Sequence, residues 1–166
     1  MEPRTEQASF AAGCFWGVEA YFKRVKGVVR ATAGYCGGST ENPSYEQVCG
    51  GRTGHAESVL VEFDPAIVPY ERLLYHFWKI HNPTQVNRQG NDIGSQYRSV
   101  IFTHSEGQRE AAEGSKIELE RSGHYRHSIA TAIESATEFW PAEEYHQDYL
   151  AKNPAAYCHV DLSNVD

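Results

Sequence analysis

The chain has 166 residues, with 22 acidic and 15 basic side chains and a formal net charge of −7. A chain of this length buries about 70% of the surface that its unfolded form exposes, which suffices for one domain with its own core. The acidic balance argues against binding nucleic acid or an anionic membrane. Without a long apolar run or an apolar start after MEPRTEQ, the chain predicts neither a membrane span nor a secretion signal. We therefore expect one soluble, cytoplasmic domain over residues 1–166.

Strands and helices alternate along the chain. Patterning predicts, in order, a strand at 7–12, a helix from Gly13 to Gly27, a strand at 28–35, a glycine-rich loop over 36–55, a strand at 56–63 and a helix opened by Pro69 and ended by Asn82. A polar loop precedes a strand at 97–103, a helix at about 105–121, a strand at 128–134 and a last helix beginning near Pro141. The first six elements run β-α-β-β-α-β. This order predicts an α+β two-layer sandwich with a ferredoxin-like core, an appended α-β-α and a coil tail.

Cys14 lies in the segment GCFWG, where the first strand meets the first helix. A lone cysteine is often just a small buried apolar residue. At the start of a helix, however, the dipole and the unpaired backbone N–H groups lower a thiol pKa and favour the thiolate. The flanking Gly13 and Gly17 allow close backbone approach, and Phe15 and Trp16 could wall an apolar pocket, although Phe15 also fits the core stripe. The segment therefore favours a reactive thiol beside aromatic rings.

Glu57 begins the alternating segment AESVLVEF. The alternation places it on the same strand face as Val59, Val61 and Phe63, the face that we expect to be buried, whereas Glu62 falls on the other face. Desolvation there raises the pKa of a carboxyl, which then keeps a proton near neutral pH and can act as a general acid. The alternative is that Glu57 lies solvated at a frayed strand end. The pattern alone leaves both interpretations open.

The two long loops carry polar side chains in apolar company: Tyr45 in the first loop, and Asp92, Gln96 and Tyr97 in the second. A phenol keeps its O–H donor at neutral pH, so the two tyrosines could bind a ligand oxygen. Surface turn chemistry explains the neighbourhood of Asp92 equally well. Composition does not decide between the two.

Cys158 stands near the C-terminus, in a segment, 153–166, that we expect to be mobile. Its thiol could then reach another sulfur. A thiolate, an aromatic pocket, a proton donor and a remote second thiol together suggest that Cys14 forms a sulfenic acid, which Cys158 traps as a disulfide.

From about Phe10 through Cys158 the sequence closely resembles type A peptide methionine sulfoxide reductase. The motifs that carry the resemblance are GCFWG, GYCGG, YEQVCGGRTGHAE, HFWKIHNPTQVNRQGNDIGSQYRS and EYHQDYLAKNP. The resemblance implies a thiol-dependent oxidoreductase that reduces the S epimer of methionine sulfoxide, free or in oxidised proteins, and so repairs oxidative damage. It implies no bound cofactor or metal, and a disulfide that thioredoxin reduces. We expect a monomer.

The resemblance also assigns a role to individual residues. Cys14 matches the nucleophile, Cys158 the recycling cysteine, and Glu57 the acid that protonates the sulfoxide oxygen. The remaining matches are Tyr45 and Tyr97, which assist Glu57 by hydrogen bonding, Asp92, which lines the site, Phe15 and Trp16, which hold the ε-methyl group, and His146 and Tyr149, which form an outer set.

The chain departs from the family pattern at its cysteines. Many relatives carry a second recycling cysteine in a glycine-rich tail, whereas this sequence has none after Cys158, so a single resolving step is implied. Cys36 replaces a non-thiol residue of the GYxGG motif and could compete with Cys158, although a bystander role is the simpler interpretation. Cys49 fits the family pattern, but the residues indicate no function for it.

Three other functions are consistent with parts of the sequence. A cysteine hydrolase would pair Cys14 with a histidine, of which His55 is the most suggestive, but no triad is evident. A metal-binding module could use His124 and His127. A thiol peroxidase would also need a reactive cysteine and a resolving one, but it leaves the aromatic rings beside a proton donor unexplained.

Overall fold

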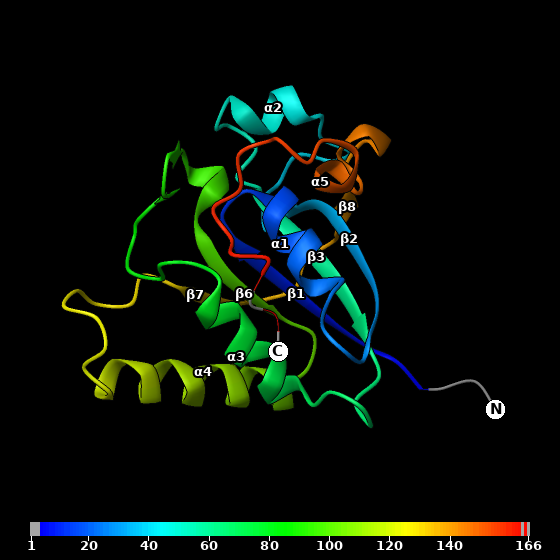
Figure 1. The fold of residues 1–166 in the computed structure, drawn as a ribbon. Helices are drawn as coiled ribbons and strands as arrows, with labels where there is room; N and C mark the ends of the chain where they lie inside the picture. Colours follow the sequence, from blue (N-terminus) through cyan, green and yellow to red (C-terminus); the bar gives the residue numbers. More distant parts are fainter. Residues whose placement is uncertain (1–3, 164, 166) are drawn as a thin grey trace.

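The computed structural model describes residues 4–163 and 165, which form a six-stranded sheet with helices packed against it (Figure 1). The strands are β1 (Glu6–Ala12), β2 (Val28–Cys36), β3 (Ala56–Phe63), β6 (Ser99–Thr103), β7 (Ala132–Ser135) and β8 (Trp140–Pro141), in the spatial order β7-β6-β1-β3-β2-β8. The four central strands pair antiparallel, while β7 joins the edge in parallel to β6. The expected α+β fold is confirmed, and its four central strands follow the order β6-β1-β3-β2.

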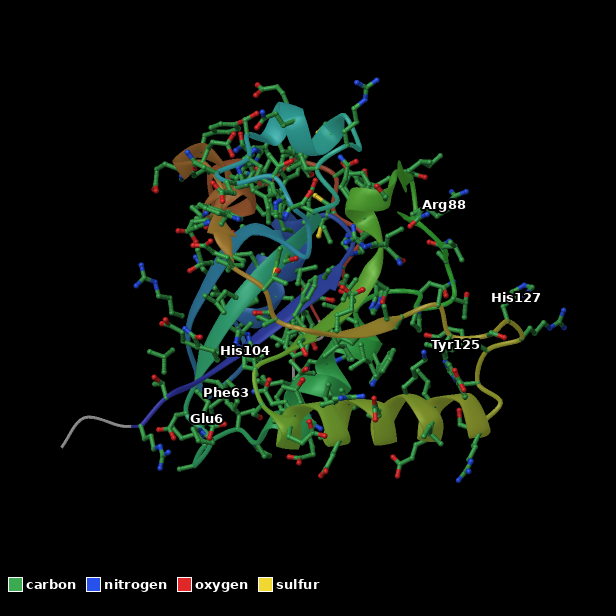
Figure 2. The ribbon with its side chains drawn as sticks, turned by 180° about the vertical axis from the view of Figure 1, so that it is seen from behind. Glu6, Phe63, Arg88, His104, Tyr125 and His127 are labelled. Carbon is green, nitrogen blue, oxygen red and sulfur yellow. The ribbon has the colours of Figure 1, made fainter. Side chains whose placement is uncertain are left out.

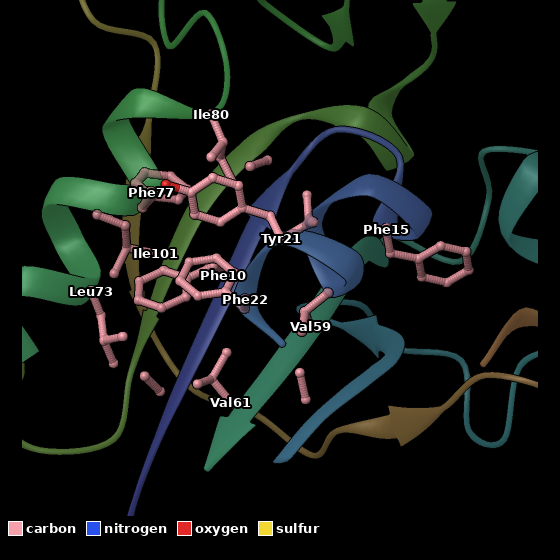
Figure 3. Close-up of a cluster of buried hydrophobic side chains, with 14 of the residues drawn as sticks. Phe10, Phe15, Tyr21, Phe22, Val59, Val61, Leu73, Phe77, Ile80 and Ile101 are labelled. Atoms are coloured by element: carbon pink, nitrogen blue, oxygen red, sulfur yellow. The ribbon is translucent and has the colours of Figure 1, made fainter. Parts of the chain in front are cut away.

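The main core lies between the sheet and helices α1 (Phe15–Phe22) and α3 (Tyr70–Lys79), which Figure 1 shows on the same face. The ring of Phe10 on β1 stacks on Phe22 of α1 and on Phe77 of α3, with centroid distances of 5.2 and 5.4 Å (Figure 3). A fully buried side chain of this kind contributes about 1.5–3 kcal/mol. Helix α4 (Glu106–Arg121) packs against α3 and β6. These contacts fix the end of β1, from which the site begins.

A smaller core covers the opposite face of the sheet. Phe102 and Val100 of β6 pack there with Cys36, beneath the chain around Ala136 and Phe139. The thiol of Cys36 is 1% exposed and lies 3.6 Å from the hydroxyl of Thr137. This position agrees with the bystander interpretation of Cys36.

The C-terminal third differs from the sequence expectation. The strand predicted at 128–134 begins only at Ala132, because the Ala130 N–H instead donates to the carbonyl of Pro83 at 2.7 Å. The helix predicted from Pro141 is wrong: β8 pairs with β2, a 3-10 turn η2 (Glu144–His146) follows, and only α5 (Tyr149–Lys152) is α-helical. The segment extends the sheet edge instead, since the Ala142 N–H donates to the carbonyl of Ala33.

Both predicted loops contain short elements. Helix α2 (Tyr45–Cys49) lies inside the loop at 36–55 and begins with a capping box, in which Ser44 Oγ accepts from the Gln47 N–H and Gln47 Oε1 accepts from the Ser44 N–H. The S-x-x-Q spacing is the signal that could have found it. The second loop holds the hairpin of β4 (Arg88–Gln89) and β5 (Asp92–Ile93), followed by the turn η1 (Ser95–Tyr97).

The tail after α5 returns along α1. The guanidinium of Arg24 donates to the carbonyl of Leu162 at 2.8 Å, and Val160 is buried against the main core. The mobility of this segment stays a prediction. Within residues 4–163 and 165, no helix is both long and apolar enough to cross a membrane.

Candidate active site

The turn between β1 and α1 positions Cys14. Gly13 has a φ of +94°, which favours glycine, and a Cβ there would lie 2.9 Å from the side chain of Gln89 and 3.0 Å from Nε2 of His159. Cys14 follows as the N-cap residue of α1 and is a partly exposed free thiol. The close packing around Gly13 therefore holds the sulfur at the helix start.

The pKa of Cys14 differs from the sequence expectation. Burial raises it well above the usual thiol range, and the nearby carboxyl of Glu57 raises it further. The Trp16 backbone N–H lowers the pKa, as expected at a helix start, but burial outweighs this effect. The resting thiol is therefore protonated at neutral pH.

Glu57 is buried, with 1% of its surface exposed, so the interpretation as a solvated strand end is wrong. Its Oε1 accepts from the Phe15 backbone N–H at 3.2 Å, directly after Cys14 in the chain. Burial raises its pKa from 4.5 to about 8, and the carboxyl of Asp92 adds to this, while the Phe15 N–H and the Gln96 amide lower it. Glu57 therefore holds a proton at neutral pH beside the Cys14 turn.

The predicted polar groups gather around Glu57. Burial raises the pKa of Tyr45 and of Tyr97, and the charge of Glu57 is the next largest cause for both. Both phenols therefore keep their O–H at neutral pH. Asp92 lies close enough to raise the pKa of Cys14, and its Oδ2 is buried with no hydrogen-bond partner among the described residues. The structure thus brings the loop residues to one place.

The four predicted aromatic residues form one cluster. The ring of Trp16 stacks on Tyr149 with a centroid distance of 3.7 Å and an interplanar angle of 9°, and its Nε1 donates to Nδ1 of His146 at 3.0 Å. The Phe15 ring lies 5.2 Å from that of His146 and is almost fully buried, whereas Trp16 is partly exposed. Trp16 is thus the more accessible of the two rings beside Cys14.

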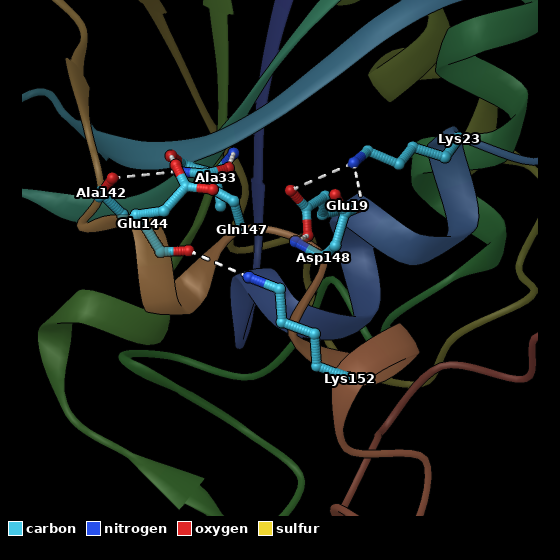
Figure 4. Close-up of polar contacts among 8 residues, drawn as sticks. All are labelled: Glu19, Lys23, Ala33, Ala142, Glu144, Gln147, Asp148 and Lys152. Carbon is cyan, nitrogen blue, oxygen red and sulfur yellow. Dashed lines mark hydrogen bonds and ion pairs between the residues drawn. The ribbon is translucent and has the colours of Figure 1, made fainter.

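Two groups of polar contacts hold Gln147 and Asp148, the residues between His146 and Tyr149, and neither group was predicted (Figure 4). The buried carboxylate of Glu19 accepts from the Asp148 N–H at 2.9 Å, and Lys23 bonds Asp148 and lies 3.7 Å from Glu19. The Gln147 side chain accepts from the N–H of Ala33 and donates to its carbonyl. Glu19 lies four residues after buried Phe15, and this helical spacing could have indicated its burial.

Glu143 connects the aromatic cluster to α2. The Tyr35 hydroxyl donates to one of its oxygens at 2.8 Å and the Tyr45 N–H to the other at 2.9 Å. Although burial disfavours the charge, these hydrogen bonds hold the pKa of Glu143 below its usual value. Sequence patterning gave no signal for Glu143, because it lies in the segment predicted as a helix.

The tail brings Cys158 to the first turn of α1. A Cβ on Gly17 would lie 2.7 Å from the sulfur of Cys158, so only glycine leaves room for that sulfur. The Val160 N–H donates to the same sulfur at 3.4 Å. The two thiols are close enough for Cys158 to raise the pKa of Cys14. The structure therefore places a second free thiol at the helix that begins with Cys14.

The histidines of the other interpretations are engaged or remote. Nδ1 of His55 accepts from the Gly38 N–H at 3.0 Å and Nε2 donates to the carbonyl of Thr40 at 2.7 Å, so the ring orders its loop. His124 and His127 are exposed, and Figure 2 shows His127 pointing away from the fold after α4. In the described part of the chain, no three His, Cys, Asp or Glu side chains could hold a metal ion.

Comparison with known proteins agrees with this geometry. The family model described as peptide methionine sulfoxide reductase matches residues 6–166. A relative from Methanothermobacter thermautotrophicus, named peptide methionine sulfoxide reductase MsrA, is 59% identical over 157 residues, which cover 95% of this chain and 93% of the relative.

Two solved structures of Mxr1 from Saccharomyces cerevisiae are similar in fold. The reduced form has a TM-score of 0.89 and 38% identity, covering 96% of this chain and 92% of its own. The complex with Trx2 has a TM-score of 0.63 and 25% identity, covering 90% of this chain and 89% of its own.

Proposed function

The chain belongs to the type A peptide methionine sulfoxide reductase family and is an oxidoreductase, and we propose that it reduces the S epimer of methionine sulfoxide with Cys14 as nucleophile and Glu57 as acid. Its substrates are free methionine sulfoxide and oxidised proteins, and thioredoxin is the external reductant. We expect the chain to act as a monomer without a bound cofactor.

One observation carries the proposal: a buried carboxyl touches the backbone directly beside a thiol, and its burial favours the protonated form. Glu57 accepts from the Phe15 N–H, and Trp16 presents a partly exposed ring next to Cys14. A methionine sulfoxide carries a polar S–O group and an apolar methyl, so it needs a proton donor and an aromatic surface side by side. The methyl group lies against Phe15 and Trp16, and Tyr45 and Tyr97 donate to the oxygen.

The first step transfers the oxygen. Cys14 ionises as the substrate binds, its sulfur attacks the sulfoxide sulfur, and Glu57 gives its proton to the oxygen. The hydroxyl then passes to Cys14, which leaves methionine and a Cys14 sulfenic acid. Methionine sulfur gains two electrons and Cys14 loses two. The proton that Cys14 released restores the acid form of Glu57, so no net proton is consumed.

The second step regenerates the thiol. The thiolate of Cys158 attacks the sulfur of Cys14, the S–O bond breaks, and water leaves with the proton that Cys158 gave up. The resulting disulfide takes two electrons from a thioredoxin dithiol. The position of Cys158 beside Gly17 supports this step, and so does the solved complex of Mxr1 with Trx2.

A rate assay on the separated S and R epimers of a methionine sulfoxide peptide tests the proposal, first with dithiothreitol and then with thioredoxin. We expect turnover of the S epimer alone. Equal turnover of both epimers would overturn the stereochemistry. No turnover of either, with Cys14 reduced and the protein folded, would overturn the activity and direct attention to peroxide and acyl substrates.

Two serine variants separate the steps in the same assay. Cys14→Ser should abolish turnover with both reductants. Cys158→Ser should release one methionine per chain and lose turnover with thioredoxin. Continued thioredoxin turnover by Cys158→Ser would transfer the resolving role to Cys36 or Cys49.

A further inference from the structure

The imidazole of His159 connects the tail to the turn that carries Cys14. Its Nε2 donates to the carbonyl of Ala12, the last residue of β1, at 2.7 Å. The same nitrogen lies 3.0 Å from the position of a Cβ on Gly13. The ring is therefore packed directly against the backbone that precedes Cys14.

The other side of the ring faces the second loop. Nδ1 of His159 is buried, and neither it nor Oδ2 of Asp92 has a hydrogen-bond partner within residues 4–163 and 165. The two groups are close enough that each shifts the pKa of the other. His159 thus joins the tail to the Cys14 turn by direct contact, and the charge of Asp92 on β5 acts on its ring.

The position of His159 determines where the neighbouring sulfur lies. Cys158 directly precedes it, and the Cys158 sulfur occupies the space beside Gly17 in which a Cβ would not fit. Val160 follows and packs against the same glycine. Cys14 and Gly17 are three residues apart at the start of one helix, a spacing that places them on neighbouring positions, roughly 5–6 Å apart. A tail held by His159 therefore keeps Cys158 within a short movement of Cys14.

We propose that His159 is a positioning residue for the resolving step: its hydrogen bond to the Ala12 carbonyl docks the tail on the Cys14 turn and so presents Cys158 to the Cys14 sulfenic acid. This inference rests on the proposed roles of Cys14 and Cys158. His159 makes and breaks no bond in the reaction. It changes only how often Cys158 is in place when the sulfenic acid forms.

Single-turnover kinetics without reductant test this role, because they resolve the two steps. Methionine release reports the first step, and loss of the second thiol together with dimedone labelling of the sulfenic acid reports disulfide formation. In His159→Ala we expect methionine release within about twofold of wild type and disulfide formation about tenfold slower, which is the effect of losing one hydrogen bond of roughly 1.4 kcal/mol. The dimedone adduct of Cys14 should accumulate.

Two further variants make the test specific. In His159→Gln the side-chain amide can still donate to the Ala12 carbonyl, so disulfide formation should recover to within about threefold of wild type. His127→Ala removes an exposed histidine far from the tail and should match wild type in both steps.

The outcomes separate this inference from the proposed function. Suppose that the wild-type protein forms the Cys14–Cys158 disulfide. The role of His159 would then be overturned if His159→Ala formed this disulfide equally fast, or if His159→Gln formed it as slowly as His159→Ala. If His159→Ala slowed methionine release as much as disulfide formation, His159 would act in the first step, and its proposed positioning role would also be overturned. Absence of a Cys14–Cys158 disulfide in the wild-type protein would instead overturn the proposed resolving role of Cys158.

Discussion

Two buried glutamates, Glu19 on α1 and Glu57 on β3, differ in the charged group beside them. Glu57 and Glu19 are each 1% exposed, and each accepts one backbone N–H, from Phe15 and Asp148 respectively. Burial raises the pKa of both carboxyls. At Glu19 the ammonium of Lys23 is the main opposing effect, whereas at Glu57 the nearby charged group is another carboxyl, Asp92.

The difference shows how one residue type serves two purposes in one fold. A cation beside a buried carboxyl offsets part of the cost of burying its charge, and such a carboxyl can hold a backbone segment in place. A buried carboxyl beside a second carboxyl keeps its proton and can give it away. Glu19 therefore belongs to the scaffold of the aromatic cluster, and Glu57 to the proposed chemistry.

The test with the largest expected effect removes the carboxyl of Glu57. Glu57→Ala should lower the single-turnover rate of methionine formation by about 10²–10⁴, the usual contribution of a general acid. Glu57→Gln should be milder, because its amide can still hydrogen-bond the oxygen. Glu62→Gln, on the other face of β3, is the matched control and should match wild type. Equal rates for Glu57→Ala and wild type would remove the acid role.

The second test uses pH. The folded-state pKa of Glu57, about 8, lies above its ordinary value of 4.5. The neutral carboxyl therefore favours the folded state below pH 4.5, and this advantage is lost as pH rises through 8, by an amount on the order of several kcal/mol. In urea unfolding from pH 4 to 9, the free energy of unfolding of wild type should fall relative to that of Glu57→Gln as the pH rises. A constant difference across this range would contradict the raised pKa.

The third test removes the scaffold carboxyl. Glu19→Leu removes the acceptor of the Asp148 N–H from a partly buried hydrogen bond, which should cost about 1 kcal/mol in urea unfolding. Because Tyr149 then loses its fixed place on Trp16, we expect KM to rise several-fold with little change in kcat. Glu19→Gln keeps an acceptor and should restore KM. A fall in kcat without a change in KM would contradict a scaffold role.

The smallest test removes the cation. Lys23 has 35% of its side chain exposed, so Lys23→Met should lower stability by only about 0–1 kcal/mol, and added salt should reduce the difference. Urea unfolding at low and high salt measures this effect. A loss of stability well above 2 kcal/mol would show that Lys23 stabilises the buried carboxyl of Glu19 more than a partly exposed cation is expected to.

Local patterns predicted the elements whose burial is a property of their own sequence. The alternation of β3 and the apolar stripe of α3 appear where expected, since each presents one face to the main core. The C-terminal part followed its pattern only in part: the strand predicted at 128–134 begins at Ala132, and the helix predicted from Pro141 does not form. Its backbone groups bond Pro83 and Ala33, which are far away in sequence, and a local pattern carries no information about such partners.

The candidate site also has features that the local sequence indicates and features that only the fold determines. Alternation placed Glu57 on the strand face expected to be buried but left a solvated strand end open, and the fold decides for burial. The direction of the Cys14 pKa shift was not predicted, because the helix start is a local effect whereas the burial that outweighs it is a property of the folded chain. The stack of Trp16 on Tyr149 also joins residues 133 positions apart, and only the fold brings them together.

The glycine beside Cys158 has a kinetic consequence. A sulfenic acid at Cys14 is open to further oxidation by peroxide, which would inactivate the protein irreversibly. Because Gly17 lets the Cys158 sulfur rest on α1 itself, the proposed Cys14–Cys158 disulfide would form within one molecule, at an effective concentration of about millimolar or more. Peroxide in solution must exceed that concentration to compete at equal reactivity. In the proposed mechanism, the absence of a methyl group at position 17 thus protects Cys14 from irreversible oxidation of its sulfenic acid.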